Sequence, residues 1–277
     1  MKAGIYIRKE ELKHDPRYAE LIDSLSEAGC ECYQVGSKDE LQPQTDLILA
    51  VGGDGTFLSA SIVAADTGIP VMGANLGRLG FLSENRWQAV GAALASGDYT
   101  VENRTILHSC ISACTGVGAV DNWPYALNEV CVHRTGASML AVVVTIDGTT
   151  LPTYWADGLL VATSSGSTAY SLSVGGPIVL PESKVLIISP ISPHNLNVRP
   201  LIVPDTTEVR LKFHTRDSRL MLTLDNRSAE IDPSFEVDVK MAQFSLKRLR
   251  LNTSNFIDAL TGKLFWGEDI RNDIKDI

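Results

Sequence analysis

Three glycines and a carboxylate follow directly on the apolar run DLILAV, in the segment Gly52-Gly53-Asp54-Gly55-Thr56. Glycine permits positive φ and lets a ligand approach the backbone closely. The N–H groups of such a turn, together with the start of a following helix, can form a cradle for phosphate. Asp54 would then be a carboxylate beside bound phosphate. A tight β–α turn that merely needs glycine is the alternative explanation.

Two further polar clusters lie later in the chain. One extends from Asp157-Gly158 through the run TSSGSTAYSLS at 163–173 to Gly175-Gly176-Pro177. Its hydroxyl and loop N–H groups suit a ligand that carries ribose and amide groups, and the ring of Tyr170 could stack on a base. The other is the pair Asn128-Glu129, which could bind adenine edges or ribose hydroxyls. A serine-rich surface loop and a solvated strand start are the respective alternatives.

The elements that must position these residues change type near residue 100. Before it, strand and helix patterns alternate, and Gly29 is placed to end the first long helix. This alternation is typical of a doubly wound parallel sheet, in which ligands bind at the carboxyl ends of the strands. The expected strands are 3–7, 30–35, 46–51 and 69–72, and the expected helices are 18–25, 57–65 and 87–95.

After residue 100 the chain consists mainly of short β-type runs, with a hairpin signal at Asp147-Gly148. We therefore predict an α/β domain over 1–100 and a mostly antiparallel β domain over 101–254. The tail, 255–277, is expected to pack back on the first domain. The β-type runs are 105–114, 125–133, 139–146, 158–163, 185–188, 208–213, 220–225, 234–239 and 245–251.

Composition excludes several classes of function. The 277 residues are 44% hydrophobic, which is ample for a core, and the net charge of −9 argues against a nucleic-acid binder. The densest basic cluster (Lys247, Arg248 and Arg250) alternates with apolar residues and is interpreted as the solvated face of a strand. No apolar run approaches the ~18 residues of a membrane span. Five cysteines without a CxxC pair favour reduced thiols and a cytoplasmic protein.

Known nucleotide signatures are also missing from the sequence. There is no GxxxxGK[ST] segment, so a Walker-type lysine cradle is not available. There is no GxGxxG segment either, which excludes a standard dehydrogenase fingerprint. The five histidines show no HxxxH spacing, so we expect no structural zinc site.

The combination and order of these motifs resemble the NAD kinase family. The resemblance covers nearly the whole chain and is weaker over the first 45 residues. The GGDGT segment alone is shared with the wider diacylglycerol kinase and phosphofructokinase group, whereas its combination with NE and GSTAY is far more specific. The matching segments are 52–56, Asn75 to Leu82 (NLGRLGFL), 128–129, 157–158, 166–170, Ser192-Pro193-His194, Arg199-Pro200 and Phe265-Trp266-Gly267.

The resemblance implies an N-terminal α/β domain, a C-terminal β-sandwich and an active site between them. It further implies a homo-oligomer, a tetramer or dimer, in which a neighbouring subunit completes the NAD site. Asp54 would be the general base, and Gly52, Gly53, Gly55 and Thr56 would bind the phosphates of ATP. The implied NAD-binding residues are Asp54, Gly55, Phe57, Asn128, Glu129, Asp157, Ser165, Thr168, Ala169, Tyr170 and Ser173.

The implied reaction moves the γ-phosphoryl group of ATP to the ribose 2′-hydroxyl of NAD. Mg²⁺, or another divalent metal, would be held mainly by the ATP phosphates rather than by protein ligands. A diacylglycerol-type lipid kinase and a non-catalytic dinucleotide sensor are the alternatives. The acidic chain shows no membrane-binding stretch, and the intact Asp54 argues against a sensor.

Three positions depart from the family pattern. Ser164 stands where many members have proline. Arg227 lies in the segment LDNR, where members often read Asp-Gly-Gln, so the resemblance does not imply a ligand role for it. Trp155 occupies a position that is arginine in some members, which leaves the choice of phosphate donor open.

Overall fold

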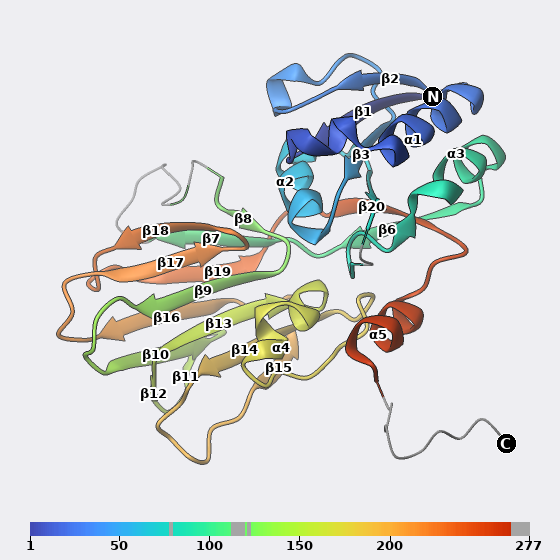
Figure 1. The fold of residues 1–277 in the computed structure, drawn as a ribbon. Coiled ribbons are helices and arrows are strands. Elements are labelled where there is room, and N and C mark those ends of the chain that lie inside the picture. The colour runs from blue at the N-terminus through green and yellow to red at the C-terminus, as the bar shows by residue number, and fades with distance from the viewer. Residues whose placement is uncertain (78–79, 112–119, 121–122, 267–277) are drawn as a thin grey trace, which may run out of the picture. The chain divides into compact units, whose positions relative to one another are not determined.

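The computed structural model describes residues 1–77, 80–111, 120 and 123–266, which form two compact units (Figure 1). The first unit is Met1–Glu102 together with the chain from Lys247 onward, and the second is Asn103–Leu246. Several predicted features lie outside the described residues. They are Arg78 and Leu79 of the NLGRLGFL segment, the end of the expected strand 105–114, and the tail from Gly267.

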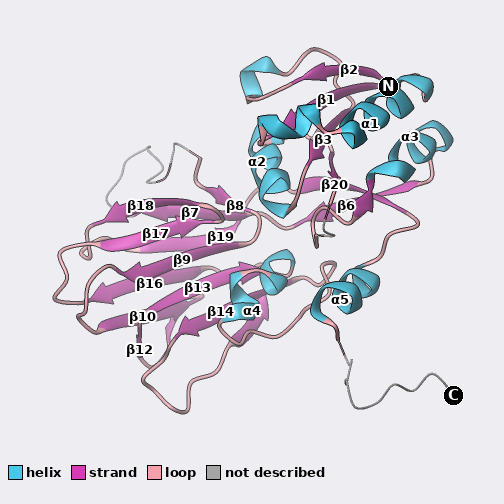
Figure 2. Cartoon of the chain, in the orientation of Figure 1, coloured by secondary structure: helices cyan, strands magenta, loops and turns pink. Residues whose placement is uncertain are grey.

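The first unit is built on a largely parallel sheet, whose described strands follow the order β2-β1-β3-β4-β20-β6, with β5 paired to β4 (Figure 2). The strands are β1 Lys2–Ile7, β2 Glu31–Gln34, β3 Leu47–Val51, β4 Val71–Asn75, β5 Asn85–Arg86, β6 Tyr99–Arg104 and β20 Leu246–Leu251. The helices are α1 Pro16–Glu27, α2 Asp54–Ala64, α3 Trp87–Ser96 and α5 Phe256–Leu264, with short 3-10 turns at Glu10–His14 and Lys38–Glu40.

Strand β3 shows why the sheet is doubly wound. All five of its residues are buried, so both of its faces are covered. Leu47, Leu49 and Val51 pack in one cluster with side chains of α1 and α3, whereas α2 packs against β3 without joining that cluster. The two faces of β3 therefore meet different helices, as the unbroken apolar run predicts.

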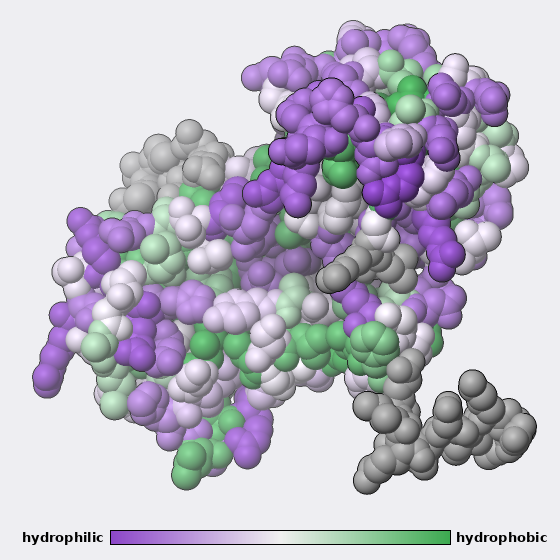
Figure 3. Space-filling view, in the orientation of Figure 1, coloured by the Kyte–Doolittle hydropathy of each residue, from purple (hydrophilic) through white to green (hydrophobic). Residues whose placement is uncertain are grey.

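One face of this unit is mainly polar (Figure 3). Purple, hydrophilic side chains predominate on the face of the first unit that Figure 3 shows. Helix α1 follows this division, since Leu21 and Leu25 are buried while Arg17, Glu20 and Asp23 are not. Among the described residues, no helix is long and apolar enough to cross a membrane.

The sequence-based boundary between the domains is wrong at two strands, because β6, which crosses the expected boundary after residue 100, and β20 both lie in the first sheet. The run 245–251 was expected in the β domain, but β20 lies in the first sheet, between β4 and β6, and pairs parallel with β4 at Arg248 and Val71. A short β-type run is compatible with either sheet, because its partners are set by the fold and not by its own pattern.

The second unit is an antiparallel β-sandwich, as expected. One sheet has the order β11-β10-β16-β19-β7-β8, with β12 paired to β10, and the other has the order β15-β14-β13-β9-β17-β18. Apolar side chains of both sheets, among them Val142 and Leu211 of one and Val132 and Val161 of the other, form a single core cluster. Two sheets that bury their apolar faces against each other in this way define a sandwich.

The strands of the two sheets are short. The first sheet contains β7 Leu107–Ile111, β8 Tyr125–Ala126, β10 Leu140–Ile146, β11 Thr149–Thr150, β12 Tyr154–Ala156, β16 Val209–His214 and β19 Val237–Met241. The second contains β9 Glu129–Arg134, β13 Gly158–Thr163, β14 Val185–Ile191, β15 Leu201–Pro204, β17 Leu220–Leu224 and β18 Arg227–Ile231. The predicted hairpin joins β10 to β11, and both Asp147 (φ 47°) and Gly148 (φ 82°) have positive φ. A 3-10 turn, Ser165–Thr168, and the short helix α4, Tyr170–Ser173, follow β13.

Candidate active site

The glycine turn joins the buried strand β3 to helix α2, at the carboxyl edge of the parallel sheet. Gly52 has φ 146°, and a Cβ at this position would lie 2.5 Å from the hydroxyl oxygen of Thr56. Gly53 is the N-cap of α2 with φ −87°, so of the three glycines in the turn only Gly52 uses the positive φ that glycine permits. The first N–H groups of a helix have no acceptor within it, so the turn presents donors suited to an anion.

Asp54 is the first residue of α2, but its side chain does not cap that helix. Its carboxylate accepts hydrogen bonds from the backbone N–H groups of Phe81, Leu82 and Ser83, each at 3.0 Å. A Cβ on Gly80 would lie 1.9 Å from Oδ1 of Asp54, so glycine is needed there for the close approach. The NLGRLGFL segment and the glycine turn therefore meet at this carboxylate, although they are separated in sequence.

The charge of Asp54 is stabilised in place. Burial by itself raises the pKa of this carboxyl group, but the ammonium group of Lys263 and the three N–H donors together bring the pKa below its ordinary value. The Nζ atom of Lys263, on α5, lies 3.2 Å from Oδ2. The carboxylate remains 29% exposed, so it is ionised and still accessible to a ligand.

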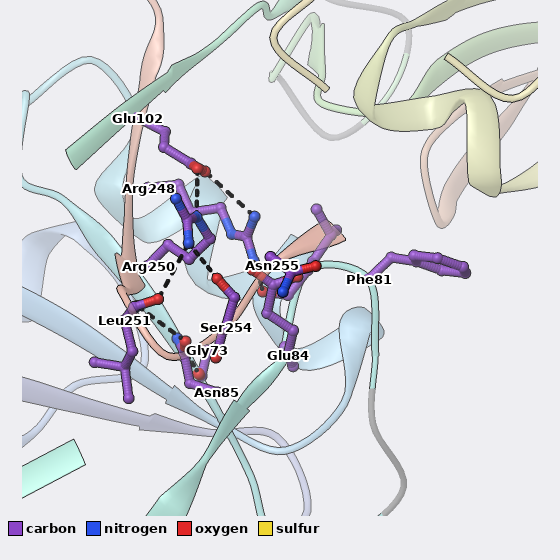
Figure 4. A network of polar contacts seen from close by, with 12 residues as sticks. Gly73, Phe81, Glu84, Asn85, Glu102, Arg248, Arg250, Leu251, Ser254 and Asn255 are labelled. Atoms are coloured by element: carbon purple, nitrogen blue, oxygen red, sulfur yellow. Dashed lines mark hydrogen bonds and ion pairs between the residues drawn. The ribbon is translucent and has the colours of Figure 1, made fainter. Parts of the chain in front are cut away.

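A buried charge network holds the segment that donates to Asp54 (Figure 4). Arg248 of β20 lies 2.9 Å from Glu84 and 3.4 Å from Glu102, and it also donates to the carbonyl of Leu82 at 3.3 Å. Asn85 bridges two strands: its amide donates to the carbonyl of Gly73, and its Oδ1 accepts from the N–H of Leu251. These contacts fix the loop after β4 against β20.

The prediction that Lys247, Arg248 and Arg250 form a solvated face is wrong for Arg248, whose side chain is 2% exposed. Burial raises the pKa of its partner Glu84, and the guanidinium group of Arg248 counteracts this rise. The basic cluster gives no sign in sequence of the partners of Arg248, because Glu84 and Glu102 approach it only in the folded sheet.

Three further side chains lie at or near the turn: that of Arg8 is exposed, and those of Thr56 and Phe57 are buried. Arg8 follows β1 directly, is exposed, and places its Nη1 atom 3.5 Å from where a Cβ of Gly55 would be. Thr56 is buried at the start of α2. Phe57 is fully buried, so its side chain has a packing role, and the NAD contact expected of it stays a prediction.

In the second unit, Asn128 and Glu129 start strand β9 and are both buried. The carboxylate of Asp225, in the turn between β17 and β18, accepts from the N–H groups of Leu127 (2.9 Å), Asn128 (2.7 Å) and Glu129 (3.2 Å). Among the described atoms, Oδ1 of Asn128 and Oε2 of Glu129 find no hydrogen-bond partner. Buried polar atoms without partners are costly, so these two oxygens are suited to meet ligand donors.

Asp225 is a residue whose role the sequence analysis missed. The LDNR segment drew notice only as a departure from the family pattern, yet its aspartate orients the Asn128-Glu129 pair. Asp225 has φ 53° in the hairpin turn, a conformation that aspartate tolerates better than most residues. The signal that could have revealed this role is the Asp-Asn pair at 225–226, which is typical of a hairpin turn. Arg227 donates to the backbone carbonyls of Trp123 and Tyr125, which gives it a structural role.

The structure brings the GSTAY segment next to Asn128-Glu129. The backbone N–H of Tyr170 bonds to the carboxyl group of Glu129, and a Cβ on Gly166 would lie 2.2 Å from the carbonyl oxygen of Asn128. The ring of Tyr170 stacks on the ring of His133, with centroids 5.5 Å apart and an interplanar angle of 20°. One face of Tyr170 is therefore already covered by His133.

The other expected dinucleotide-binding residues are placed less uniformly. Ser165 is buried, and its hydroxyl has no partner among the described atoms, whereas Thr168 and Ala169 are half-buried and Ser173 is exposed. Asp157 forms an ion pair with Arg134 at 2.7 Å. Trp155 is 43% exposed and lies on β12, where its backbone N–H donates to Oδ1 of Asn195.

Glu129 gives a prediction on stability. Burial, with a smaller contribution from Asp225, raises the pKa of Glu129 to about 8. The folded protein then holds a proton that the unfolded chain releases above its ordinary value of 4.5, so the free energy of unfolding should fall as pH rises from about 4.5 to about 8. Glu129→Gln removes this dependence, and its thermal stability should improve relative to the wild type between pH 5 and pH 8.5.

Thermal unfolding of both proteins at several pH values measures this effect, with Glu230→Gln, at an exposed position of β18, as the matched control. A constant difference between wild type and Glu129→Gln across this range would contradict a proton held by Glu129.

Comparison with known proteins identifies the family of both halves of the chain. Residues 9–97 match the ATP-NAD kinase N-terminal domain family, and residues 127–251 match the ATP-NAD kinase C-terminal domain family. The chain is 38% identical over 240 residues to the NAD kinase of Flavobacterium psychrophilum. The aligned residues make up 85% of this chain and 81% of that protein. It is 42% identical over 231 residues to the NAD kinase of Cytophaga hutchinsonii, and this alignment covers 82% of this chain and 78% of that protein.

Solved structures show the same fold. Yeast NADH kinase, complexed with NADH, superposes with a TM-score of 0.83 at 24% identity and covers 98% of this chain and 89% of its own. An NAD kinase from Archaeoglobus fulgidus, in complex with ATP, has a TM-score of 0.76 at 25% identity and covers 96% and 99%. With both halves matched by the two domain families and relatives above 30% identity over most of its length, the chain belongs to the NAD kinase family.

Proposed function

We propose that this enzyme transfers the γ-phosphoryl group of ATP to the 2′-hydroxyl of the adenosine ribose of NAD, giving NADP and ADP. The observation that carries the proposal is the state of Asp54: it is ionised, partly exposed, and fixed beside the glycine turn by three backbone donors. A carboxylate so placed can accept the hydroxyl proton without any change in its own protonation beforehand.

In the proposed step, the ribose oxygen attacks the γ-phosphorus while its proton passes to the carboxylate of Asp54. The bond between the γ-phosphorus and the bridging oxygen breaks, and ADP leaves with the electron pair. Phosphoryl transfer requires mainly positioning and charge stabilisation from the protein. The N–H groups at Gly53 and Gly55 and the exposed guanidinium of Arg8 are suited to supply the donors for the ATP phosphates.

We propose that Mg²⁺, or another divalent metal, enters with ATP. Both oxygens of Asp54 already accept hydrogen bonds, so in the described part of the turn this carboxylate is not a ready metal ligand. That arrangement fits a metal whose ligands are mainly phosphate oxygens. Such an ion would neutralise phosphate charge close to Asp54.

Asp54, Gly55 and Phe57 are the proposed NAD contacts of the first unit, and the other proposed contacts belong to the second unit. Asn128 and Glu129 offer their unpartnered oxygens to the adenosine part, and a protonated Glu129 can also donate a hydrogen bond. Asp157, Ser165, Thr168, Ala169, Tyr170 and Ser173 are proposed to line the rest of the dinucleotide site.

Tyr170 gives a direct test of this assignment. If its free face stacks on the dinucleotide, Tyr170→Ala should weaken NAD binding by about 1–3 kcal/mol, the usual value of base stacking on an aromatic ring. The apparent affinity for ATP should change much less. Separate titrations with NAD and with MgATP measure this difference, and equal losses for both would instead indicate a tyrosine needed for folding.

The activity itself is tested by incubating the protein with MgATP and NAD and assaying for NADP. Polyphosphate as the donor and NADH as the acceptor complete the panel. Formation of NADP supports the proposal, whereas its absence with every donor would favour a dinucleotide sensor. Sedimentation with lipid vesicles tests the lipid kinase alternative.

We also propose that the enzyme is a cytoplasmic homo-oligomer, a dimer or tetramer, that binds neither nucleic acid nor membranes. The support is the family resemblance and the acidic composition, with a net charge of −9. Light scattering at assay concentrations tests the assembly.

A further inference from the structure

Lys263 is a charged residue at the site that no sequence motif pointed to. It lies in the last turn of α5, far from Asp54 in sequence, yet its Nζ atom is 3.2 Å from Oδ2 of Asp54. The same ammonium group lies 4.4 Å from the ring centroid of Phe81. Because the N–H of Phe81 donates to that same oxygen, Phe81 and Lys263 hold Oδ2 together.

Helix α5 is fixed where this contact requires it. The ring of Phe256 packs against the ring of Phe81, with centroids 5.9 Å apart. The side chain of Asn255 caps the helix by accepting from the N–H of Asp258. Arg250 of β20 binds both Glu102 and the carbonyl of Ser254, so the chain that leads into α5 is tied to the sheet (Figure 4).

We propose that Lys263 is a positioning residue for Asp54, whose ammonium group keeps the carboxylate oriented by the N–H groups of residues 81–83 while a phosphate anion is bound nearby. This inference rests on the proposed kinase function of the same site. Lys263 is 37% exposed, so its contact with Asp54 does not close the site.

The charges around Asp54 explain why a cation is needed. Burial alone raises the pKa of Asp54, and Lys263 is the foremost influence that lowers it, followed by the three N–H groups. Among the described residues, Arg8, in the segment after β1, is a further cation beside the turn. Bound phosphates would add negative charge and favour a protonated Asp54, which could not act as a base. Lys263 opposes that change.

The test compares Lys263→Met with Lys263→Arg. We expect Lys263→Met to lower kcat at pH 7.5 by roughly 10- to 100-fold, because misplacing a catalytic group costs up to about 10²-fold. As the pH is lowered, the kcat of Lys263→Met should begin to fall at a higher pH than the kcat of the wild type. The reason is that the pKa of Asp54 rises without the cation, so the base becomes protonated earlier. Lys263→Arg should restore most of kcat and the original pH profile, and the KM for NAD should change little.

Lys247→Met is the matched control, because it removes an exposed cation of β20 in the same unit and should behave as the wild type. A Lys263→Met enzyme with wild-type kcat and an unchanged pH profile would overturn the proposal. A purely structural role predicts lower thermal stability with an unchanged pH profile, which would overturn it as well.

Thermal unfolding of the wild type, Lys263→Met, Asp54→Asn and the double variant separates this inference from the proposed function. Non-additive effects of the two substitutions would show that the residues interact in solution. Additive effects would remove the basis of the inference. If instead the wild type formed no NADP while the two residues remained coupled, the proposed kinase function would be wrong and the ion pair would stand.

Discussion

Replacing Asp54 with asparagine is expected to lower kcat by roughly 10²- to 10⁴-fold, the usual contribution of a general base. The amide keeps the size of the side chain but cannot take the proton of the ribose hydroxyl. It also offers one oxygen where the carboxylate has two, so the N–H donors of Phe81, Leu82 and Ser83 lose part of their acceptor. The affinity for NAD should change little, because the amide oxygen can still accept from the hydroxyl.

Measurement of kcat, NAD affinity and thermal stability for Asp54→Asn separates a chemical role from a structural one. Asp66→Asn is the control, since it removes an exposed aspartate that pairs with Lys38 at the surface. A helix-capping role would predict near-normal turnover with a loss of about 0.5–2 kcal/mol in stability. Near-normal kcat in a folded Asp54→Asn enzyme would refute the base assignment and leave the turn as a phosphate cradle.

Gly166→Ala should produce the second large effect, on NAD binding. The new Cβ would lie 2.2 Å from the carbonyl oxygen of Asn128 and 2.6 Å from its carbonyl carbon, and backbone atoms cannot rotate away as a side chain can. The loop and the start of β9 must therefore separate. We expect the KM for NAD to rise roughly 10- to 100-fold, with a loss of about 1–3 kcal/mol in stability, the typical cost of overpacking.

Steady-state kinetics with each substrate varied in turn measure the effect of Gly166→Ala. Gly262→Ala is the control, because it adds the same methyl group in helix α5 where, apart from the helix's own backbone and the neighbouring residues, no described atom lies within 4 Å. An unchanged KM for NAD would show that the contact between Gly166 and Asn128 does not shape the dinucleotide site. An equal rise in the KM for ATP would point to general damage to the fold.

Local patterns in the sequence were sufficient for much of the fold. The unbroken apolar run before Gly52 predicted a strand covered on both faces, and β3 is buried throughout. Gly29, with φ 74°, follows helix α1 as predicted, and Asp147-Gly148 forms the predicted hairpin. These features depend on residues a few positions apart, whose backbone preferences and periodicity are written in the chain itself.

The motifs also identified the family, because the order and content of GGDGT, NE and GSTAY are properties of the sequence. The motifs did not reveal the burial, the pKa or the packing of the residues that they contain. That Phe57 is buried, that Glu129 has a pKa of about 8 and that Tyr170 already stacks on His133 depends on neighbours brought by other elements.

The tertiary structure alone decided which distant residues serve the candidate site. Lys263 reaches Asp54 across 209 positions, and Asp225 reaches Asn128 across 97. Arg248 was expected in solvent but lies buried with Glu84, because β20 joins the first sheet instead of the sandwich. Charge pairing and hydrogen bonding fall off within a few ångströms in space and are indifferent to separation along the chain. The sequence therefore determined the longer buried strands, the glycine and hairpin turns and the motif residues. The folded chain determined the short strands, such as β12, β15 and β18, and the partners that orient and charge the motif residues.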